Sequence, residues 1–217
     1  MKERNFVNLS KEDLVEIHNR IQERFATTTA AGISKKGLVD SIVKRPDQIL
    51  YGRESFPDIY SKAASIMEAT LRWHVFADGN KRTGLIATET YLKINGFVCI
   101  YPLDAVRFSV LVAATEGEEQ EVTDNLIRQI ADWLEVFVAE KTDRDKVGII
   151  AASMSDRIHE YGAIYDKSPE EARKIMEVWF AADIYPEYKK EMGLVLDFLK
   201  DMYNQILEDA KIGETEK

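Results

Sequence analysis

The sequence has little of what several common protein classes depend on. Cys99 is the single cysteine among 217 residues, so no internal disulfide and no cysteine metal cage can form. The three histidines argue against a histidine-rich metal site. No apolar run approaches the roughly 18 residues of a membrane span, and no secretory signal is visible at the start. A reduced, cytoplasmic location is expected, with Cys99 as a buried structural thiol.

Positive charge is also in short supply. The chain has 29 Lys and Arg against 38 Asp and Glu, which gives a net charge of −9. Such an acidic chain is a poor binder of nucleic acid or of an anionic membrane, and neither is expected as a partner. It can bind a phosphate ligand only if its positive groups are gathered in one place. Hydrophobic residues make up 45% and charged residues 31%, as in an ordinary soluble globular protein.

Helical spacing of apolar residues is common along the chain, and an all-α fold is predicted. Ser10 and Asp13 predict the N-cap and acidic first turn of a helix that continues to about Phe25. Pro57 suits the first turn of a later helix, and His74 continues that helix's core-facing stripe. Other helices are expected over residues 34–43, 80–95 and 104–114, and between the acidic turn at 116–119 and residue 137.

Non-helical structure is expected at a few places. Residues 46–57 hold two prolines and a glycine and are predicted to be a loop with a short extended piece. Residues 97–101 are predicted to be a short strand. The charged stretch 139–146 is the best candidate for a boundary between a domain of residues 1–140 and an extension of residues 141–217. Two or three more helices are predicted in that extension.

Two positive charges, Lys81 and Arg82, lie together in residues 74–84, HVFADGNKRTG, here called the motif segment. A helix is predicted to begin near Asn80, and the N-terminus of a helix offers N–H groups and the positive end of its dipole to an anion. Gly79 allows the backbone to turn tightly and to approach a ligand. A small anion site is therefore predicted at Asp78, Gly79, Asn80, Lys81, Arg82 and Thr83.

Two further side chains suit transfer of a phosphorus group to a hydroxyl. Imidazole is the usual general base for a hydroxyl nucleophile, which points to His74. Asp78 is the only carboxylate of the motif segment and could hold Mg²⁺. Plainer interpretations stay open, because His74 could be a packed core histidine or simply pair with Asp78. Two ligands of a transition metal are a further possibility, against which the shortage of histidine and cysteine argues.

The motif segment resembles the active-site motif of the Fic/Doc family, in particular its Doc-like (death-on-curing) branch, H-x-F-x-[DN]-[GA]-N-K-R-T-[AG]. Nine of its eleven positions match a specified residue type. The resemblance extends over roughly residues 9–137. It implies a Fic-type helical core with a short flap over residues 46–57 beside the active site, plus extra C-terminal helices. It also implies ATP and Mg²⁺ as cosubstrates and a Ser, Thr or Tyr hydroxyl of a protein as acceptor.

The resemblance assigns a role to each residue of the motif segment. His74 would be the general base, Asp78 would hold the metal, and Phe76 would anchor the segment in the core. The nucleotide-binding residues would be Gly79, Asn80, Lys81, Arg82 and Thr83, with Arg82 as the phosphate clamp.

Two positions distinguish the branches of the family. AMP-transferring Fic enzymes typically read H-P-F-x-x-G-N-G-R-x-x-R, whereas this chain has Lys81 at the second glycine and Leu85 at the second arginine. Both changes match the Doc pattern, in which ATP is inverted and its γ-phosphate is transferred, by toxins that act on a translation elongation factor. A toxin-type protein phosphotransferase is therefore predicted. The alternatives are an adenylyltransferase and a nonenzymatic binding module on the same fold.

Family members are commonly inhibited by a helix bearing [ST]-x-x-x-E-[GN]. Glu116-Gly117 is the one Glu-Gly pair here, and Val112 occupies the position four residues before Glu116, so the motif is absent. A separate antitoxin-like chain is therefore expected to inhibit this protein. The alternative is that residues 141–217 do so without the motif. A plainer interpretation of these residues, as helices that only extend the core, is slightly favoured over that alternative.

Overall fold

The computed structural model describes residues 5–25, 32–101, 105–117 and 119–150. They belong to the first of two compact units, Met1–Ser155, which is followed by Asp156–Lys217. The helices predicted in the second unit lie outside the described residues.

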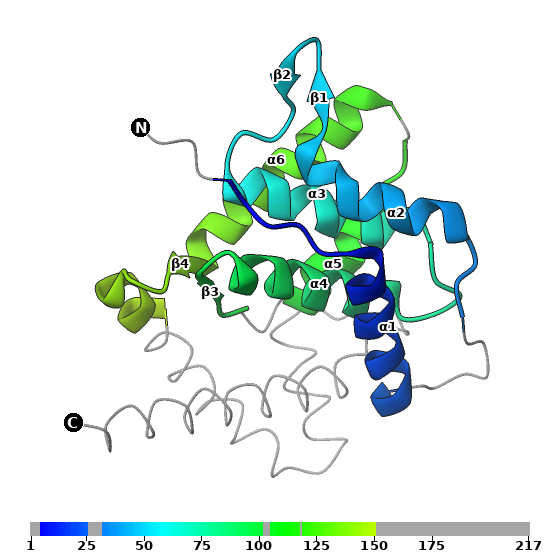
Figure 1. Ribbon diagram of the computed structural model, residues 1–217, viewed down its shortest axis with the longest axis horizontal. Helices are drawn as coiled ribbons and strands as arrows, with labels where there is room; N and C mark the ends of the chain where they lie inside the picture. The colour runs from blue at the N-terminus through cyan, green and yellow to red at the C-terminus, as the bar shows by residue number, and fades with distance from the viewer. Residues whose placement is uncertain (1–4, 26–31, 102–104, 118, 151–217) are drawn as a thin grey trace, which may run out of the picture. The chain divides into compact units, whose positions relative to one another are not determined.

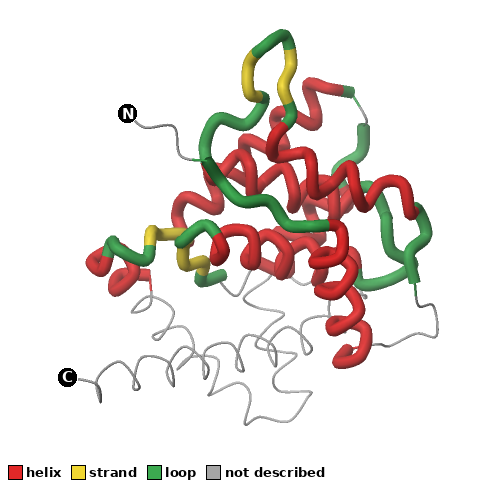
Figure 2. The backbone as a smooth tube through the Cα atoms, viewed as in Figure 1, coloured by secondary structure: helices red, strands yellow, loops and turns green. Residues whose placement is uncertain are grey.

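Helices make up most of the described chain, which confirms the all-α prediction (Figures 1 and 2). They are α1 (Lys11–Phe25), α2 (Lys36–Lys44), α3 (Ile59–Arg72), α4 (Asn80–Ile94), α5 (Ala105–Ala114) and α6 (Gln120–Phe137). A 3-10 turn, η1 (Arg45–Asp47), extends α2, and residues 144–150 are also helical. None of the described helices has the length and apolar content needed to cross a bilayer.

Helix α3 is the centre of the described fold, because α2, α4, α5 and α6 all pack against it. Its small residues Ala63, Ala64 and Ala69 are completely buried, which allows neighbouring helices to approach closely. Helix α4 lies beside it and buries Tyr91 and Leu92. The candidate site is formed where the chain leaves α3 and enters α4, so it is carried by the two most tightly packed helices.

Local capping explains where the first helices begin. The Ser10 hydroxyl accepts from the Asp13 amide at 3.0 Å, and the Asp13 carboxylate accepts from the Ser10 amide at 2.8 Å, which confirms the predicted cap. The prediction that Pro57 lies in the first turn of α3 was wrong. Asp58 is the N-cap, and its carboxylate accepts from the Ser61 amide at 2.8 Å in a capping box. Pro57 therefore precedes the cap.

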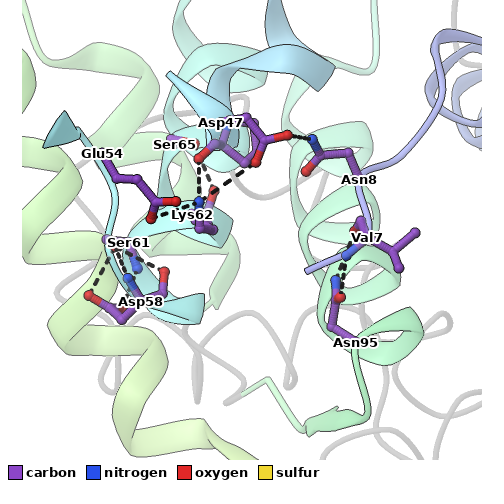
Figure 3. A network of polar contacts seen from close by, with 10 residues as sticks. Val7, Asn8, Asp47, Glu54, Asp58, Ser61, Lys62, Ser65 and Asn95 are labelled. Atoms are coloured by element: carbon purple, nitrogen blue, oxygen red, sulfur yellow. Dashed lines mark hydrogen bonds and ion pairs between the residues drawn. The ribbon is translucent and has the colours of Figure 1, made fainter. Parts of the chain in front are cut away.

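The predicted extended piece is a hairpin of β1 (Ile49–Leu50) and β2 (Arg53–Glu54), which projects from the helices in Figure 1. Its base is held by the buried Lys62 of α3, shown in Figure 3. The Lys62 ammonium donates to the Pro46 carbonyl at 2.8 Å and pairs with the Asp47 and Glu54 carboxylates at 3.7 and 3.5 Å. The tip is exposed, so the hairpin is anchored at one end and open at the other.

Only one strand of the second strand pair was predicted from the sequence. β3 (Phe97–Cys99) was expected, and Cys99 is buried, which raises the pKa of its thiol. Its antiparallel partner β4 (Val138–Glu140) was not expected (Figure 2). The chain stays packed beyond β4, because Ile150 joins Ile100 and Ala139 in one apolar cluster. The domain division at residue 140 stays a prediction.

One carboxyl of α4 makes stability depend on pH. Burial raises the pKa of Glu89 from 4.5 to about 7, and Lys93 opposes this shift. A carboxyl group whose pKa is higher in the folded than in the unfolded protein stabilises the fold while it is protonated. This contribution is fully present below the pKa of the unfolded state and is lost as the pH rises through the pKa of the folded state. We expect the unfolding free energy to fall by about 1–3 kcal/mol between about pH 5 and pH 8 on this account. Denaturant titrations at several pH values measure the unfolding free energy. In Glu89→Gln this part of its decrease with pH should be absent, whereas a variant at an exposed site, Glu121→Gln, should show the same decrease as the wild type.

Candidate active site

His74 lies at a sharp corner where α3 ends. Helix α3 stops at Arg72, Trp73 is its C-cap, and the Lys35 ammonium donates to the Trp73 carbonyl at 2.8 Å. His74 follows with a φ of +50°, in the left-handed region, and its side chain is exposed. The prediction that His74 continues the core-facing stripe of α3 was wrong, because the chain has left the helix by this residue. An exposed imidazole is accessible to a hydroxyl that comes from another molecule.

The chain beyond His74 is fixed to the segment that precedes α2. The Val75 carbonyl accepts from the Ser34 and Lys35 amides at 2.8 and 3.1 Å, and the Ala77 amide donates to the Gly32 carbonyl at 3.0 Å. Val75 and Phe76 are buried, so the expected anchoring position of Phe76 is confirmed. His74 is therefore an exposed residue on a backbone that is held from both sides.

Asn80 closes the turn between the two helices. Its side-chain oxygen accepts from the Phe76 amide at 3.0 Å, and its side-chain nitrogen donates to the Phe76 carbonyl at 2.8 Å. Both ends of the amide are thus used within the protein. The predicted contribution of Asn80 to anion binding then rests on its backbone at the start of α4 rather than on its side chain.

Replacing Asn80 with alanine should open this turn. The variant loses two hydrogen bonds to the Phe76 backbone, and we expect the unfolding free energy to fall by about 1–3 kcal/mol. Urea denaturation of the variant and of Asn125→Ala, on the exposed face of α6, measures the effect. Equal stability of the two variants would contradict a closing role for Asn80.

Charged side chains gather at the N-terminus of α4. Gly79 is the N-cap with a φ of +76°, and its carbonyl accepts from the Thr83 amide at 2.9 Å. The Asp78 carboxylate accepts from the Gly79 amide at 2.6 Å, which orients it at the helix end. Lys81 is partly exposed and Arg82 is buried. The start of α4 lies at Asn80, where the sequence predicted it, and the anion site expected at this helix end stays a prediction.

Asp78 is the one carboxylate of the motif segment, and it was predicted to hold Mg²⁺. No group of three or more His, Cys, Asp or Glu side chains that could hold a metal occurs among the residues that the structure describes. Mg²⁺ is commonly bound through one or two carboxylates, with phosphate oxygens and water as its remaining ligands. A single carboxylate such as Asp78 would suit a metal that binds together with a nucleotide, and its assignment stays a prediction.

His18 of α1 belongs to this site and was not predicted there. Its ring is 1% exposed and stacks on Phe76 with 3.8 Å between ring centroids and 9° between planes. Its Nδ1 lies 3.2 Å from the hydroxyl of the buried Thr83. Burial lowers the pKa of His18, and the charge of Asp78 partly offsets this. The available signal was its spacing, because Leu14, His18 and Ile21 lie on one buried face of α1.

Comparisons with known proteins cover the part of the chain that contains the motif segment. Residues 8–92, which include the motif segment, match the family model described as Fic/DOC family. The chain is 43% identical over 97 residues to a protein of Mycolicibacterium smegmatis named Toxin Doc, covering 45% of this chain and 74% of that protein. It is 29% identical over 121 residues to a protein of Escherichia phage P1 named Protein kinase doc, covering 56% of this chain and 94% of that protein.

Proposed function

This chain belongs to the Fic/Doc family, and from that premise we propose that it transfers the γ-phosphate of ATP to a hydroxyl of a target protein. The observation that carries the proposal is that the exposed His74 lies in the short connection between α3 and α4, and that Asp78, Lys81 and Arg82 follow it around the start of α4. A base, a metal ligand and a cationic phosphate site are the parts that phosphoryl transfer requires.

His74 is the proposed general base. The target hydroxyl loses its proton to the His74 imidazole while its oxygen forms a bond to the γ-phosphorus. The bond between that phosphorus and the bridging oxygen breaks, and ADP leaves with the electron pair. The left-handed corner holds His74 away from the helix, so that its imidazole can meet a protein hydroxyl from outside.

The start of α4 is the proposed phosphate site. Backbone N–H groups at Asn80 and Lys81 would face the phosphate oxygens, and the guanidinium of Arg82 would add positive charge. The Gly79 amide donates to Asp78, so Gly79 would contribute through its left-handed backbone, which shapes the turn. Asp78 would hold Mg²⁺, which neutralises phosphate charge when it is bound. Thr83 is buried against His18, so its predicted part in nucleotide binding would be exerted through that contact.

The choice of kinase over AMP transfer rests on Lys81 and Leu85. Leu85 is 7% exposed and packs in the core, so nothing at that position can act as a second phosphate clamp. Lys81 places a long cationic side chain where AMP-transferring enzymes keep a glycine. The relative named Protein kinase doc supports the same choice. Adenylylation is the second candidate.

Labelled ATP separates the candidates. The full-length protein is incubated with cell lysate and with ATP labelled at either the γ- or the α-phosphorus. Label entering protein from the γ-position alone supports the proposal, whereas label from the α-position alone favours adenylylation. ATP binding without transfer to any lysate protein would favour a nonenzymatic binding module. Lys81→Gly should weaken γ-transfer and permit some AMP transfer, and unchanged chemistry would contradict the role given to Lys81.

The setting proposed for this activity is a toxin with a separate inhibitor. The relative named Toxin Doc supports a toxin–antitoxin pair, and the absence of the inhibitory sequence motif fits inhibition by another chain. A translation factor in the cytoplasm is the proposed kind of target. The exposed hairpin tip, Ile49 to Tyr51, offers a backbone edge and apolar side chains to an extended target segment.

A further inference from the structure

We propose that His18 of α1 is a positioning residue that holds the motif segment in its phosphate-binding shape. The inference rests on the proposed function, because the expected effect of losing His18 is weaker binding of ATP. The contacts themselves are a property of the fold.

His18 joins two points of the motif segment that lie on either side of the turn. Its ring stacks on Phe76, which precedes the turn, and its Nδ1 contacts the hydroxyl of Thr83, in the first turn of α4. One rigid imidazole therefore fixes the distance between the chain that enters the turn and the helix that leaves it. The residues between these two contacts are those assigned to the metal and the phosphates.

The same face of α1 also limits the middle of the turn. A Cβ atom added to Gly79 would lie 2.7 Å from the side-chain nitrogen of Gln22, and 3.7 and 3.8 Å from two ring atoms of His18. Gln22 lies one helical turn after His18. Helix α1 therefore packs against the turn at its start (Phe76), its middle (Gly79) and its end (Thr83).

The chemistry of His18 suits a neutral, fixed ring rather than a proton carrier. Its Nε2 is buried without a hydrogen-bond partner. A charged ring in this place would leave a buried N–H group unpaired, which is costly. A stacked neutral imidazole instead combines a flat packing surface with one polar contact, and neither a leucine nor a serine provides both.

The test compares His18→Ala with Leu14→Ala. Leu14 is completely buried on the same face of α1, one turn earlier, so both variants remove a core side chain from this helix. The first readout is the affinity of the full-length protein for ATP with Mg²⁺, measured by calorimetry under conditions in which each variant is folded. We expect His18→Ala to weaken binding about tenfold or more, which is about 1.4 kcal/mol, and Leu14→Ala to change it less than twofold. Equal affinities of both variants and the wild type would overturn the inference.

The second readout does not depend on the proposed function. Hydrogen exchange is followed at the Ala77 and Thr83 amides, which are bonded to the Gly32 and Gly79 carbonyls, and is compared with exchange in α3. His18→Ala should speed exchange selectively in the motif segment, and His18→Phe, which keeps the stack, should restore part of the protection. Unchanged relative exchange would sink the positioning role. A wild-type protein that binds no ATP would contradict the proposed function alone.

Discussion

Replacing His74 with asparagine is expected to lower the rate of phosphate transfer by about 10²- to 10⁴-fold, the usual contribution of a general base. Asparagine is chosen because it tolerates the left-handed backbone that His74 adopts. The His74 side chain is exposed, so its loss should change the melting temperature little. The rate is measured with γ-labelled ATP, and stability by thermal denaturation.

The control for His74 is an exposed residue outside the site. Arg20 of α1 pairs with Glu16 at 2.8 Å, and both side chains are mostly exposed, so Arg20→Ala should affect neither transfer nor stability appreciably. A His74→Asn protein that keeps the wild-type rate would show that another group removes the proton. A protein that fails to fold would show that the corner at His74 has a structural role.

Replacing Gly79 with alanine is expected to damage both the fold and nucleotide binding. Its φ of +76° costs a non-glycine residue about 1–2 kcal/mol. The added Cβ would also lie 2.7 Å from the Gln22 side-chain nitrogen, so the end of that flexible side chain must move aside. Moving this side chain adds a further cost below the roughly 1–3 kcal/mol that overpacking of a rigid core typically costs. Because the phosphate site is built on this turn, ATP affinity should fall about tenfold or more, in line with a loss of about 1.4 kcal/mol.

Gly96 provides a matched control for this change. It has a similar φ of +85°, but nothing lies within 4 Å of an added Cβ, and it sits after the other end of α4. Gly96→Ala should therefore show the backbone cost alone and leave ATP affinity unchanged. Gln22→Ala combined with Gly79→Ala should recover part of the stability that Gly79→Ala loses. Equal destabilisation by the two glycine variants, with no recovery, would rule out the contact with Gln22.

The parts of the fold that the sequence predicted are those with local causes. The cap at Ser10 depends on residues within one helical turn, and it is found as expected. The start of α4 near Asn80 was predicted for the same reason. The anion site could be proposed from the sequence because the residues assigned to it lie close together in the chain, between Asp78 and Thr83.

The features that sequence reasoning missed depend on residues far apart in the chain. His74 leaves α3 because the residues that follow it bond to residues 32–35, a contact that helical spacing near His74 does not encode. β4 forms because it pairs with β3, which lies about 40 residues earlier in the chain. Two of its residues, Ala139 and Glu140, belong to the charged stretch that was predicted to be a domain boundary, so no strand was expected there. His18 is 65 residues from Thr83, so its place in the site appears only once α1 packs against α4.

The mass added to an acceptor protein tests the central claim most directly. A lysate protein labelled in the presence of ATP and Mg²⁺ is isolated, digested and analysed by mass spectrometry, with the His74→Asn protein as the parallel sample. We expect a Ser, Thr or Tyr residue that carries one phosphate group, and no such residue in the parallel sample. An acceptor that carries AMP instead, or a phosphate that appears equally with His74→Asn, would contradict the account.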